Sequence, residues 1–305
     1  MTGGAGFLGS ALCRRLLEEG NEVICLDNLY SGYIENVADF MNNPNFHFIE
    51  HDVINPIDIQ ADMIFHLACP ASPGKYQKDS VYTSKVCFLG AINMLELARK
   101  YDARILFTST SEIYGDPDIH PQTESYRGNI NPIGKRSCYG EGKRIAESLF
   151  FDYHRQYGVK IKVARLFNVY GPEMHSQDGR VIANFVSQAL KGENITIYGD
   201  GHQTRSFCYV DDCIEGLMKL MNTGDFTGPV NIGNPEEITV LGVAEMILRL
   251  TKSTSKISHK DLPFDDEKRR KPSIELAKEV LCWEPKVKLE DGVRMTITAY
   301  REMMK

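Results

Sequence analysis

Short runs of β-branched and aromatic residues alternate with longer amphipathic segments through the first half of the chain. The runs typical of buried strands lie at residues 22–27, 46–52, 62–68, 104–110 and 161–171. Apolar positions at helical spacing fall between several of them, at residues 11–20, 87–101 and 142–158. Strands that alternate with helices in this way form parallel sheets, so we predict an α/β fold with a doubly wound parallel sheet.

The pattern changes at about residue 181. Beyond it the apolar runs are shorter and are separated by loops, as at residues 195–201, 205–212 and 229–239. This change predicts a smaller, mixed α/β lobe. We therefore expect a cofactor-binding domain at residues 1–180 and a substrate-binding lobe at residues 181–305, with some crossing of the chain between them.

Composition places the protein among ordinary globular chains. It has 305 residues, of which 42% are hydrophobic and 25% charged, and its net charge of −6 gives no support for nucleic acid or an anionic membrane as partner. No apolar run approaches the ~18 residues needed to span a bilayer, and no leader is visible, so we expect a cytoplasmic location. The eight cysteines are scattered without CxxC or zinc spacing. They predict reduced thiols and no metal site.

Three glycines open the chain at the entry to an amphipathic segment. Gly3, Gly6 and Gly9 form a GxxGxxG pattern, which lets backbone amides approach a pyrophosphate at a helix N-terminus. The strand at residues 22–27 ends in Asp27, whose carboxylate can accept hydrogen bonds from an adenosine ribose and would repel a 2′-phosphate. NAD is therefore favoured over NADP. Asp52, after the next strand, is a candidate adenine contact.

The strand that normally precedes such a glycine loop is short here. Only Met1 and Thr2 stand before Gly3, so the first and central strand is expected to be truncated. A missing central strand would leave backbone groups of its neighbours unpaired and would destabilise the fold strongly.

A hydroxyl-rich cluster ends the buried strand at residues 104–110. Ser109, Thr110, Ser111 and Glu112 stand where apolar residues would be expected. Carboxyl ends of parallel strands form the ligand crevice in doubly wound sheets, so this cluster is a candidate site. His66 also ends a strand, but for this residue we expect a packing role.

Tyr139 and Lys143 form a YxxxK pair one βα unit later. At a spacing of i and i+4 both project from one helix face, toward Thr110 and a nicotinamide at the strand ends. Tyrosine titrates near 10, and a base working near neutrality needs a pKa roughly three units lower, or about 4 kcal/mol. Lys143 and an oxidised nicotinamide can both stabilise the phenolate. Simple dehydrogenation leaves Ser111 and Glu112 without a role.

Longer segments resemble the extended short-chain dehydrogenases/reductases, and within them most closely the UDP-glucuronate decarboxylases, or UDP-xylose synthases. The resemblance covers nearly the whole chain. It is carried by residues 67–77, 108–144, 164–181, 198–212, 231–239 and 269–287. It implies a Rossmann-type doubly wound sheet with a smaller C-terminal substrate lobe, and NAD as the cofactor.

The activity implied by the resemblance is a redox-neutral decarboxylation of UDP-glucuronate. Tyr139 takes the proton of the sugar 4-hydroxyl while hydride passes to NAD⁺, and the resulting β-keto acid loses carbon dioxide because an enolate can form. Reprotonation at C5 and return of the hydride then give UDP-xylose. Glu112, buried near the substrate carboxylate, would disfavour the charged ground state. Arg270 is assigned to the sugar carboxylate or to proton delivery.

The motifs and the resemblance together give the expected site residues. The catalytic set is Thr110, Ser111, Glu112, Tyr139, Lys143 and Arg270. The cofactor-binding set is Gly3, Gly6, Phe7, Leu8, Gly9, Asp27, Asn28, Asp52, Val53, Leu67, Tyr139, Lys143, Val169 and Arg180. The substrate-binding set is Tyr76, Lys85, Asn93, Tyr153, Asn168, Tyr198, Gln203 and Arg205, of which the last three match the part of the family that grips uridine and phosphates.

Three positions depart from the family pattern. Gly140 stands where an aspartate is usual, Cys87 replaces an asparagine and Lys135 replaces a proline. None of them removes a proposed catalytic group. The resemblance also implies a homodimer joined through the helices at residues 87–101 and 142–158, although the sheet alone could use both apolar faces.

Two other functions stay open from the sequence. A 4,6-dehydratase or a 4-epimerase could use the same scaffold, but a dehydratase needs an Asp-Glu pair where this chain has Ser111 and Glu112. An epimerase needs neither Glu112 nor an arginine for a carboxylate. A non-catalytic NAD- or nucleotide-sugar-binding relative is the other alternative, motivated by the short first strand.

Overall fold

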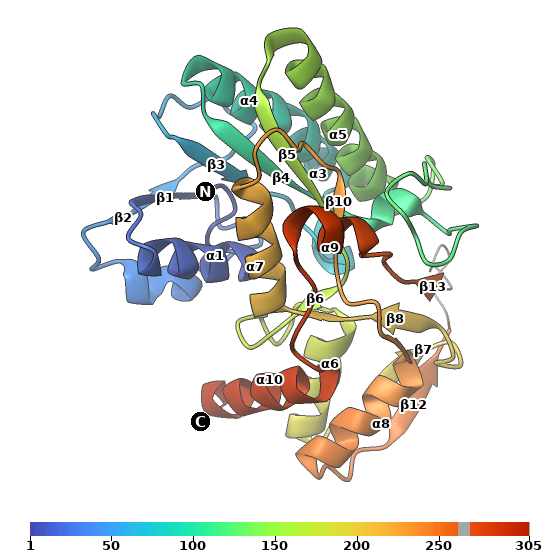
Figure 1. Ribbon diagram of the computed structural model, residues 1–305. Helices are drawn as coiled ribbons and strands as arrows, with labels where there is room; N and C mark the ends of the chain where they lie inside the picture. Colours follow the sequence, from blue (N-terminus) through green and yellow to red (C-terminus); the bar gives the residue numbers. More distant parts are fainter. Residues whose placement is uncertain (262–268, 305) are drawn as a thin grey trace.

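A parallel sheet forms the centre of the protein, whose computed structural model describes residues 1–261 and 269–304 (Figure 1). In spatial order its strands are β2 (Phe46–Glu50), β1 (Val23–Asp27), β3 (Met63–His66), β4 (Arg104–Thr110), β5 (Lys160–Leu166) and β10 (Val230–Ile232). The paired strands run parallel throughout. The predicted doubly wound parallel sheet is therefore confirmed.

Residues at the start of the chain occupy the position between β1 and β3. Thr2 bridges to Leu26 on one side and to His66 on the other. Its amide donates to the Phe65 carbonyl at 3.0 Å, and the Gly3 amide donates to the Leu26 carbonyl at 2.8 Å. We expected the backbone groups of β1 and β3 to lack partners at the centre of the sheet. At the carboxyl ends of these strands that expectation is wrong, because residues 2 and 3 hydrogen-bond to both strands where the glycine loop begins.

Helices cover both faces of this sheet (Figure 1). One face carries α1 (Phe7–Glu18) and α7 (Val210–Met221). The other face carries α4 (Ala91–Lys100) and α5 (Ser137–Tyr157), with α3 (Ser80–Lys85) beside α5. Shorter helical segments are η1 (Ile34–Phe40), α2 (Pro73–Tyr76), η2 (Val86–Gly90) and η3 (Ser111–Tyr114).

The second lobe is smaller and mixed, as predicted. Its helices are α6 (Val181–Lys191), α8 (Val240–Thr251) and α10 (Leu289–Met303). Its short strands are β6 (Val169–Tyr170) with β9 (Cys208–Tyr209), β7 (Ile195–Tyr198) with β12 (Ile257–Lys260), and β8 (Thr204–Ser206) between β11 (Glu237–Thr239) and β13 (Arg269–Arg270).

The chain returns to the first lobe after residue 180. α7 packs against α1, β10 joins the central sheet, and α9 (Glu275–Leu281) packs against β10. A large part of the second half therefore belongs to the first lobe, and one apolar core continues through both lobes.

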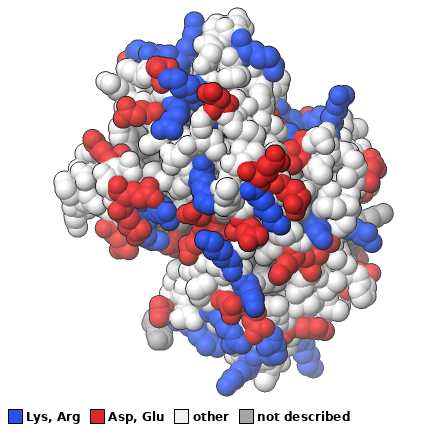
Figure 2. Space-filling view, in the orientation of Figure 1, with Lys and Arg blue, Asp and Glu red and all other residues white. Residues whose placement is uncertain are grey.

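The surface carries both signs of charge. On the face shown in Figure 2, Lys and Arg side chains are interspersed with Asp and Glu. Within residues 1–261 and 269–304, none of the helices combines the length and the apolar character that crossing a bilayer requires.

Candidate active site

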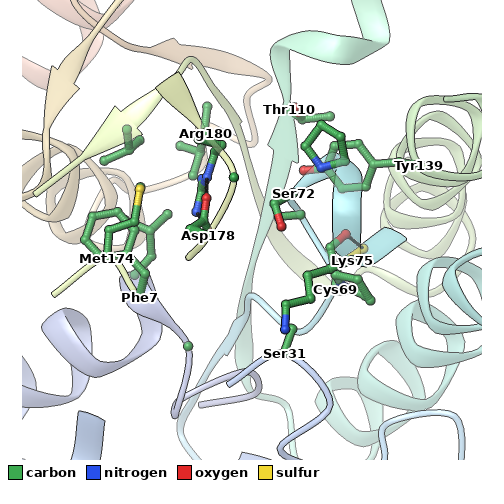
Figure 3. Close-up of a pocket in the computed structure, with 18 of the residues that line it drawn as sticks. Phe7, Ser31, Cys69, Ser72, Lys75, Thr110, Tyr139, Met174, Asp178 and Arg180 are labelled. Atoms are coloured by element: carbon green, nitrogen blue, oxygen red, sulfur yellow. Dashed lines mark hydrogen bonds and ion pairs between the residues drawn. The ribbon is translucent and has the colours of Figure 1, made fainter. Parts of the chain in front are cut away.

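A cavity of about 830 Å³ lies where the carboxyl ends of the central strands meet the second lobe. This is the position at which open α/β sheets bind ligands. Figure 3 shows its two walls: Thr110 and Tyr139 lie on one side, with Phe7, Asp178 and Arg180 on the other.

The glycine loop forms one end of the cavity. Gly3 has a positive φ of 70°, and Gly6 is the N-cap of α1. A Cβ on Gly9 would overlap the carbonyl oxygen of Gly3. The first turn of α1 therefore lies against the loop, and its free amides can face a diphosphate, as a bound dinucleotide requires.

Two carboxylates lie beyond this loop. Asp27 Oδ2 accepts from the Ala5 amide at 3.0 Å and Asp27 Oδ1 accepts from the Leu29 amide at 2.9 Å, while burial raises the pKa of this carboxyl. Asp52 Oδ2 accepts from Asn28 Nδ2 at 2.9 Å and from the Tyr82 hydroxyl at 2.7 Å. These oriented carboxylates fit the adenosine end of NAD and would disfavour an added 2′-phosphate.

The strand-end cluster forms the centre of the first-lobe wall. Thr110 ends β4 and caps η3, since its Oγ1 accepts from the Glu112 amide at 3.2 Å. Ser109 and Ser111 are buried beside it. The Glu112 side chain is 12% exposed, and its Oε1 lies 3.9 Å from Nη1 of Arg270. The cavity thus contains a nearly desolvated carboxylate within reach of a guanidinium from β13.

Tyr139 and Lys143 come from the first two turns of α5 and line the same wall. Lys143 Nζ donates to the Thr108 carbonyl at 2.8 Å. The Tyr139 ring stacks on Tyr76 with centroids 5.0 Å apart and planes 2° from parallel. The first contact joins α5 to β4 and the second joins α5 to α2, and the phenol lies close to Thr110.

The pKa of Tyr139 is raised well above its usual value. Burial is the main cause, the negative charges of Cys69 and Glu112 add to it, and the Thr110 hydroxyl opposes it. The ammonium of Lys143 is 5.9 Å from the ring centroid. The protein groups alone therefore leave the pKa of Tyr139 raised, because burial outweighs the hydrogen bond from Thr110.

The second-lobe wall supplies further polar groups to the cavity. Arg180 pairs with Asp178 through two bonds, Nε to Oδ1 at 2.5 Å and Nη2 to Oδ2 at 3.0 Å. Gln203 Nε2 donates to the Tyr198 carbonyl at 2.8 Å, and Arg205 is buried at the cavity in β8. Asn168 Nδ2 donates to the Ser206 carbonyl at 3.3 Å.

Most of the predicted site residues line the cavity. The structure brings there Gly3, Gly6, Phe7, Leu8, Gly9, Asp27, Asn28, Asp52, Val53, Leu67, Thr110, Ser111, Glu112, Tyr139, Lys143, Asn168, Val169, Arg180, Tyr198, Gln203, Arg205 and Arg270. Tyr76 lies directly behind Tyr139 and is fully buried.

Four predicted substrate contacts are not among the lining residues of the cavity: Tyr76, behind Tyr139, and three residues on helices. Lys85 is exposed at the end of α3. Asn93 points to the backbone, where its Nδ2 donates to the Val53 carbonyl at 2.8 Å. The hydroxyl of Tyr153 donates to Glu96 at 2.6 Å, between α5 and α4. Their spacing in the sequence did not reveal that these helix positions turn away from the strand ends.

Sequence reasoning missed another group of cavity residues. The Tyr33 and His175 rings stack with centroids 4.2 Å apart, and Lys75 Nζ lies 5.7 Å from the Tyr33 centroid. Ser31 and Ser72 also line the cavity. Their positions in the sequence could have indicated this, because residues 31 and 33 follow the strand ending in Asp27, residues 72 and 75 follow β3, and segments after strand ends border the ligand crevice.

The remaining candidate groups are His66 and the eight cysteines. His66 is buried, its Nδ1 lies 2.8 Å from the Thr2 hydroxyl, and burial lowers its pKa to about 3, so the predicted packing role is confirmed. All eight cysteines are free thiols. Across the described ranges, no group of His, Cys, Asp and Glu has the arrangement of a metal site.

Comparison with known proteins agrees with this geometry. A family model described as "NAD dependent epimerase/dehydratase family" matches residues 1–233. "UDP-glucuronic acid decarboxylase 6" of Arabidopsis thaliana is 54% identical over 302 residues, covering 99% of this chain and 88% of that protein.

Solved structures with the same fold include enzymes of other activities. UDP-glucose 4-epimerase of Thermotoga maritima, solved with UDP-glucose, has a TM-score of 0.91 and 31% identity over 100% of this chain and 98% of its own. UDP-glucuronic acid 4-epimerase of Bacillus cereus, in complex with UDP-glucuronic acid and NAD, has a TM-score of 0.88 and 27% identity over 99% and 98%. The chain belongs to the NAD-dependent epimerase/dehydratase family and, within it, to the group of the UDP-glucuronic acid decarboxylases.

Proposed function

We propose that this protein converts UDP-glucuronate to UDP-xylose and carbon dioxide in an NAD-dependent reaction without net oxidation. The observation that carries the proposal is the convergence of Glu112, Tyr139 and Arg270 on one cavity beside a dinucleotide loop. The likeness to named decarboxylases over 99% of the chain supports it.

The residues of the first-lobe wall fit NAD. Gly3, Gly6 and Gly9 would hold the diphosphate, Asp27 the adenosine ribose, and Asn28 and Asp52 the adenine. When bound, NAD⁺ accepts hydride from C4 of the sugar and returns it later, and its positively charged ring lowers the pKa of a nearby phenol.

Tyr139 acts as the base for the sugar 4-hydroxyl. Thr110 lies within reach of the same oxygen and positions it, while Lys143 holds Tyr139 to the end of β4 through the Thr108 carbonyl. Burial of the phenol keeps water from competing for its proton. Proton transfer at this oxygen is what allows a ketone to form at C4.

Glu112 and Arg270 serve the second half of the reaction. Once C4 is a ketone, the carboxylate on C5 can leave as carbon dioxide, because the electron pair enters the carbonyl as an enolate. A nearly buried Glu112 carboxylate close to the substrate carboxylate destabilises that charge and favours its loss. Arg270, 3.9 Å from Glu112, orients the substrate carboxylate and helps deliver the proton to C5.

The second-lobe residues bind the rest of the substrate in this proposal. Arg205 suits the diphosphate, because a guanidinium donates two parallel hydrogen bonds. Gln203 and Tyr198 contact the uridine, and Asn168 lies between the sugar and the nicotinamide. Tyr76 contributes indirectly, through its ring against Tyr139.

The test is incubation of the NAD-loaded protein with UDP-glucuronate labelled at the carboxyl carbon, with UDP-glucose as the parallel substrate. We expect labelled carbon dioxide and UDP-xylose from the first and no dehydration or epimerisation of the second. Conversion of UDP-glucuronate into an isomer without carbon dioxide would instead show a 4-epimerase. No turnover of either substrate would show a binding protein.

We also propose that the protein is a homodimer in the cytoplasm. The helical face formed by η2 and α5 carries exposed apolar side chains, including Phe88, Leu89, Ile145 and Tyr157. Ile145→Asp is expected to convert a dimer into a monomer in sedimentation experiments, whereas Ile133→Asp, at a loop position 92% exposed, is the matched control that leaves the dimer intact. A monomeric wild type would reject this assembly.

A further inference from the structure

Two thiols lie side by side in the first-lobe wall. Cys69 follows β3 and lines the cavity near Tyr139 (Figure 3), while Cys87 lies in η2 and is 3% exposed. Their Sγ atoms are 3.4 Å apart. A disulfide bond is about 2.05 Å long, so the sulfurs need to approach by only about 1.4 Å to become bonded.

The two thiols have different environments. The hydrogen bond shared with Cys87, in which either thiol can donate, lowers the pKa of Cys69, and the positive charge of Lys143 lowers it further. The same bond and burial raise the pKa of Cys87. Cys69 is therefore the better nucleophile of the two and is also the one at the cavity, since the thiolate is the reactive form.

We propose that Cys69 and Cys87 form a redox-sensitive pair, which a small hydroperoxide such as hydrogen peroxide converts into a disulfide in the active-site wall. The Cys69 thiolate attacks one peroxide oxygen, the O–O bond breaks, and sulfenic acid and hydroxide form. Cys87 then attacks that sulfur, the S–O bond breaks, and the disulfide and water result. Overall, two thiols are oxidised and one hydrogen peroxide is reduced to two waters.

The position of Cys87 connects this disulfide to the catalytic helix. Cys87 packs against α5 at Gly142, where an added Cβ would lie 2.9 Å from both its Cβ and its Sγ. Gly142 falls between Tyr139 and Lys143 in the same turn. Drawing Cys87 toward Cys69 removes this support from α5, so the base is displaced from the position set by Lys143.

The bond therefore slows turnover. A displacement near 1 Å close to reacting groups can cost up to about 100-fold, and we expect roughly a tenfold to hundredfold lower rate from the oxidised protein. This activity readout rests on the proposed function, but formation of the disulfide does not. Mass analysis of the thiols consequently tests the pair even if the substrate assignment fails.

The experiment treats the NAD-loaded protein with increasing hydrogen peroxide, blocks the remaining thiols, and digests it for mass spectrometry. We expect a cross-linked peptide joining Cys69 and Cys87, formed with the same time course as the loss of turnover. A dithiol reductant should remove the cross-link and restore the rate. Absence of the cross-link at peroxide concentrations that oxidise the exposed Cys282 would overturn the proposal.

Two variants separate this pair from general oxidation. Cys87→Ser leaves no resolving thiol, so Cys69 should stop at a sulfenic acid that dimedone traps, and no cross-link should form. Cys282→Ser is the matched control, in which cross-linking and inactivation should follow the wild-type course. Dimedone labelling of Cys69 that is no greater in Cys87→Ser than in the wild type, or full turnover in fully cross-linked protein, would contradict the proposal.

Discussion

The two walls of the cavity are built in different ways. The first-lobe wall uses backbone turns and strand ends whose polar groups are held by nearby main chain, as with Asp27 on the Ala5 and Leu29 amides. The second-lobe wall uses side chains from β7, β8 and β13 that are distant in sequence, and its Tyr198 is 45% exposed.

We infer from this difference that the first wall serves cofactor chemistry common to related enzymes, whereas the second wall serves binding of the particular substrate. Structures with nearly the same fold carry the names of 4-epimerases and of a 4,6-dehydratase. The first wall suits temporary oxidation at C4, which all these reactions can use. In the proposed function, Glu112 at the strand end and Arg270 opposite it determine what happens to the oxidised sugar.

The largest effect is expected at the base shared by these reactions. Tyr139→Phe should lower carbon dioxide release about 10³- to 10⁴-fold, near the top of the range for a proton-transfer group. Calorimetry should show UDP binding largely intact, because the phenol lies on the other wall. A variant with full turnover would remove Tyr139 from the base role and the first wall from the chemistry.

Glu112→Gln should slow carbon dioxide release by roughly 100-fold while C4 oxidation continues, because the Glu112 charge promotes loss of the substrate carboxylate in the second step. Reduced NAD and a 4-keto acid should then accumulate in rapid-mixing experiments. Loss of the Glu112 charge also lowers the pKa of Tyr139, so C4 oxidation should reach its plateau at a lower pH than in the wild type. Accumulation of reduced NAD without the keto acid would contradict this division of labour.

Gly9→Ala tests how rigid the first wall is. The added methyl group overlaps the Gly3 carbonyl, and overpacking of this kind costs typically 1–3 kcal/mol. We expect a lower melting temperature and a roughly tenfold lower affinity for NAD, measured as the cofactor retained after gel filtration. Gly224→Ala, where nothing lies within 4 Å of the new Cβ, is the matched control. Equal behaviour of the two variants would show that the loop tolerates a side chain.

Arg205→Lys probes the second wall and should have the smallest effect. Lysine keeps the charge but loses the paired donors, so we expect KM for UDP-glucuronate to rise about tenfold or less with kcat nearly unchanged. A fall in kcat larger than the rise in KM would show that this wall takes part in the chemical steps.

The sequence was most informative where interactions are local. Helical and strand periodicity predicted the sheet, and the spacing of Gly3, Gly6 and Gly9 predicted the loop, because both follow from neighbours along the chain. Cavity residues of the second wall, such as Arg270, were found only through resemblance, since β13 meets β8 by long-range pairing.

Other failures have equally specific causes. Asn93 and Tyr153 lie on helices at the sheet, but contacts with Val53 and Glu96 direct them away from the cavity. The Tyr139–Lys143 spacing indicates a nearby cation but not the depth of burial, which raises the pKa of Tyr139 in the protein without NAD. Gly140, where the family usually has an aspartate, lies against Ile130, whose Cδ1 would be 2.3 Å from an added Cβ.

The hydrogen bond from Lys143 to the Thr108 carbonyl ties helix α5 to strand β4. One end of this tether shares a helix with the phenol, and the other lies two residues before the hydroxyl of Thr110. A movement of α5 away from β4 would therefore stretch the Lys143–Thr108 hydrogen bond before it moved the Tyr139 phenol away from Thr110. In the proposed function, the main chain of β4 therefore sets the position of Tyr139 relative to Thr110.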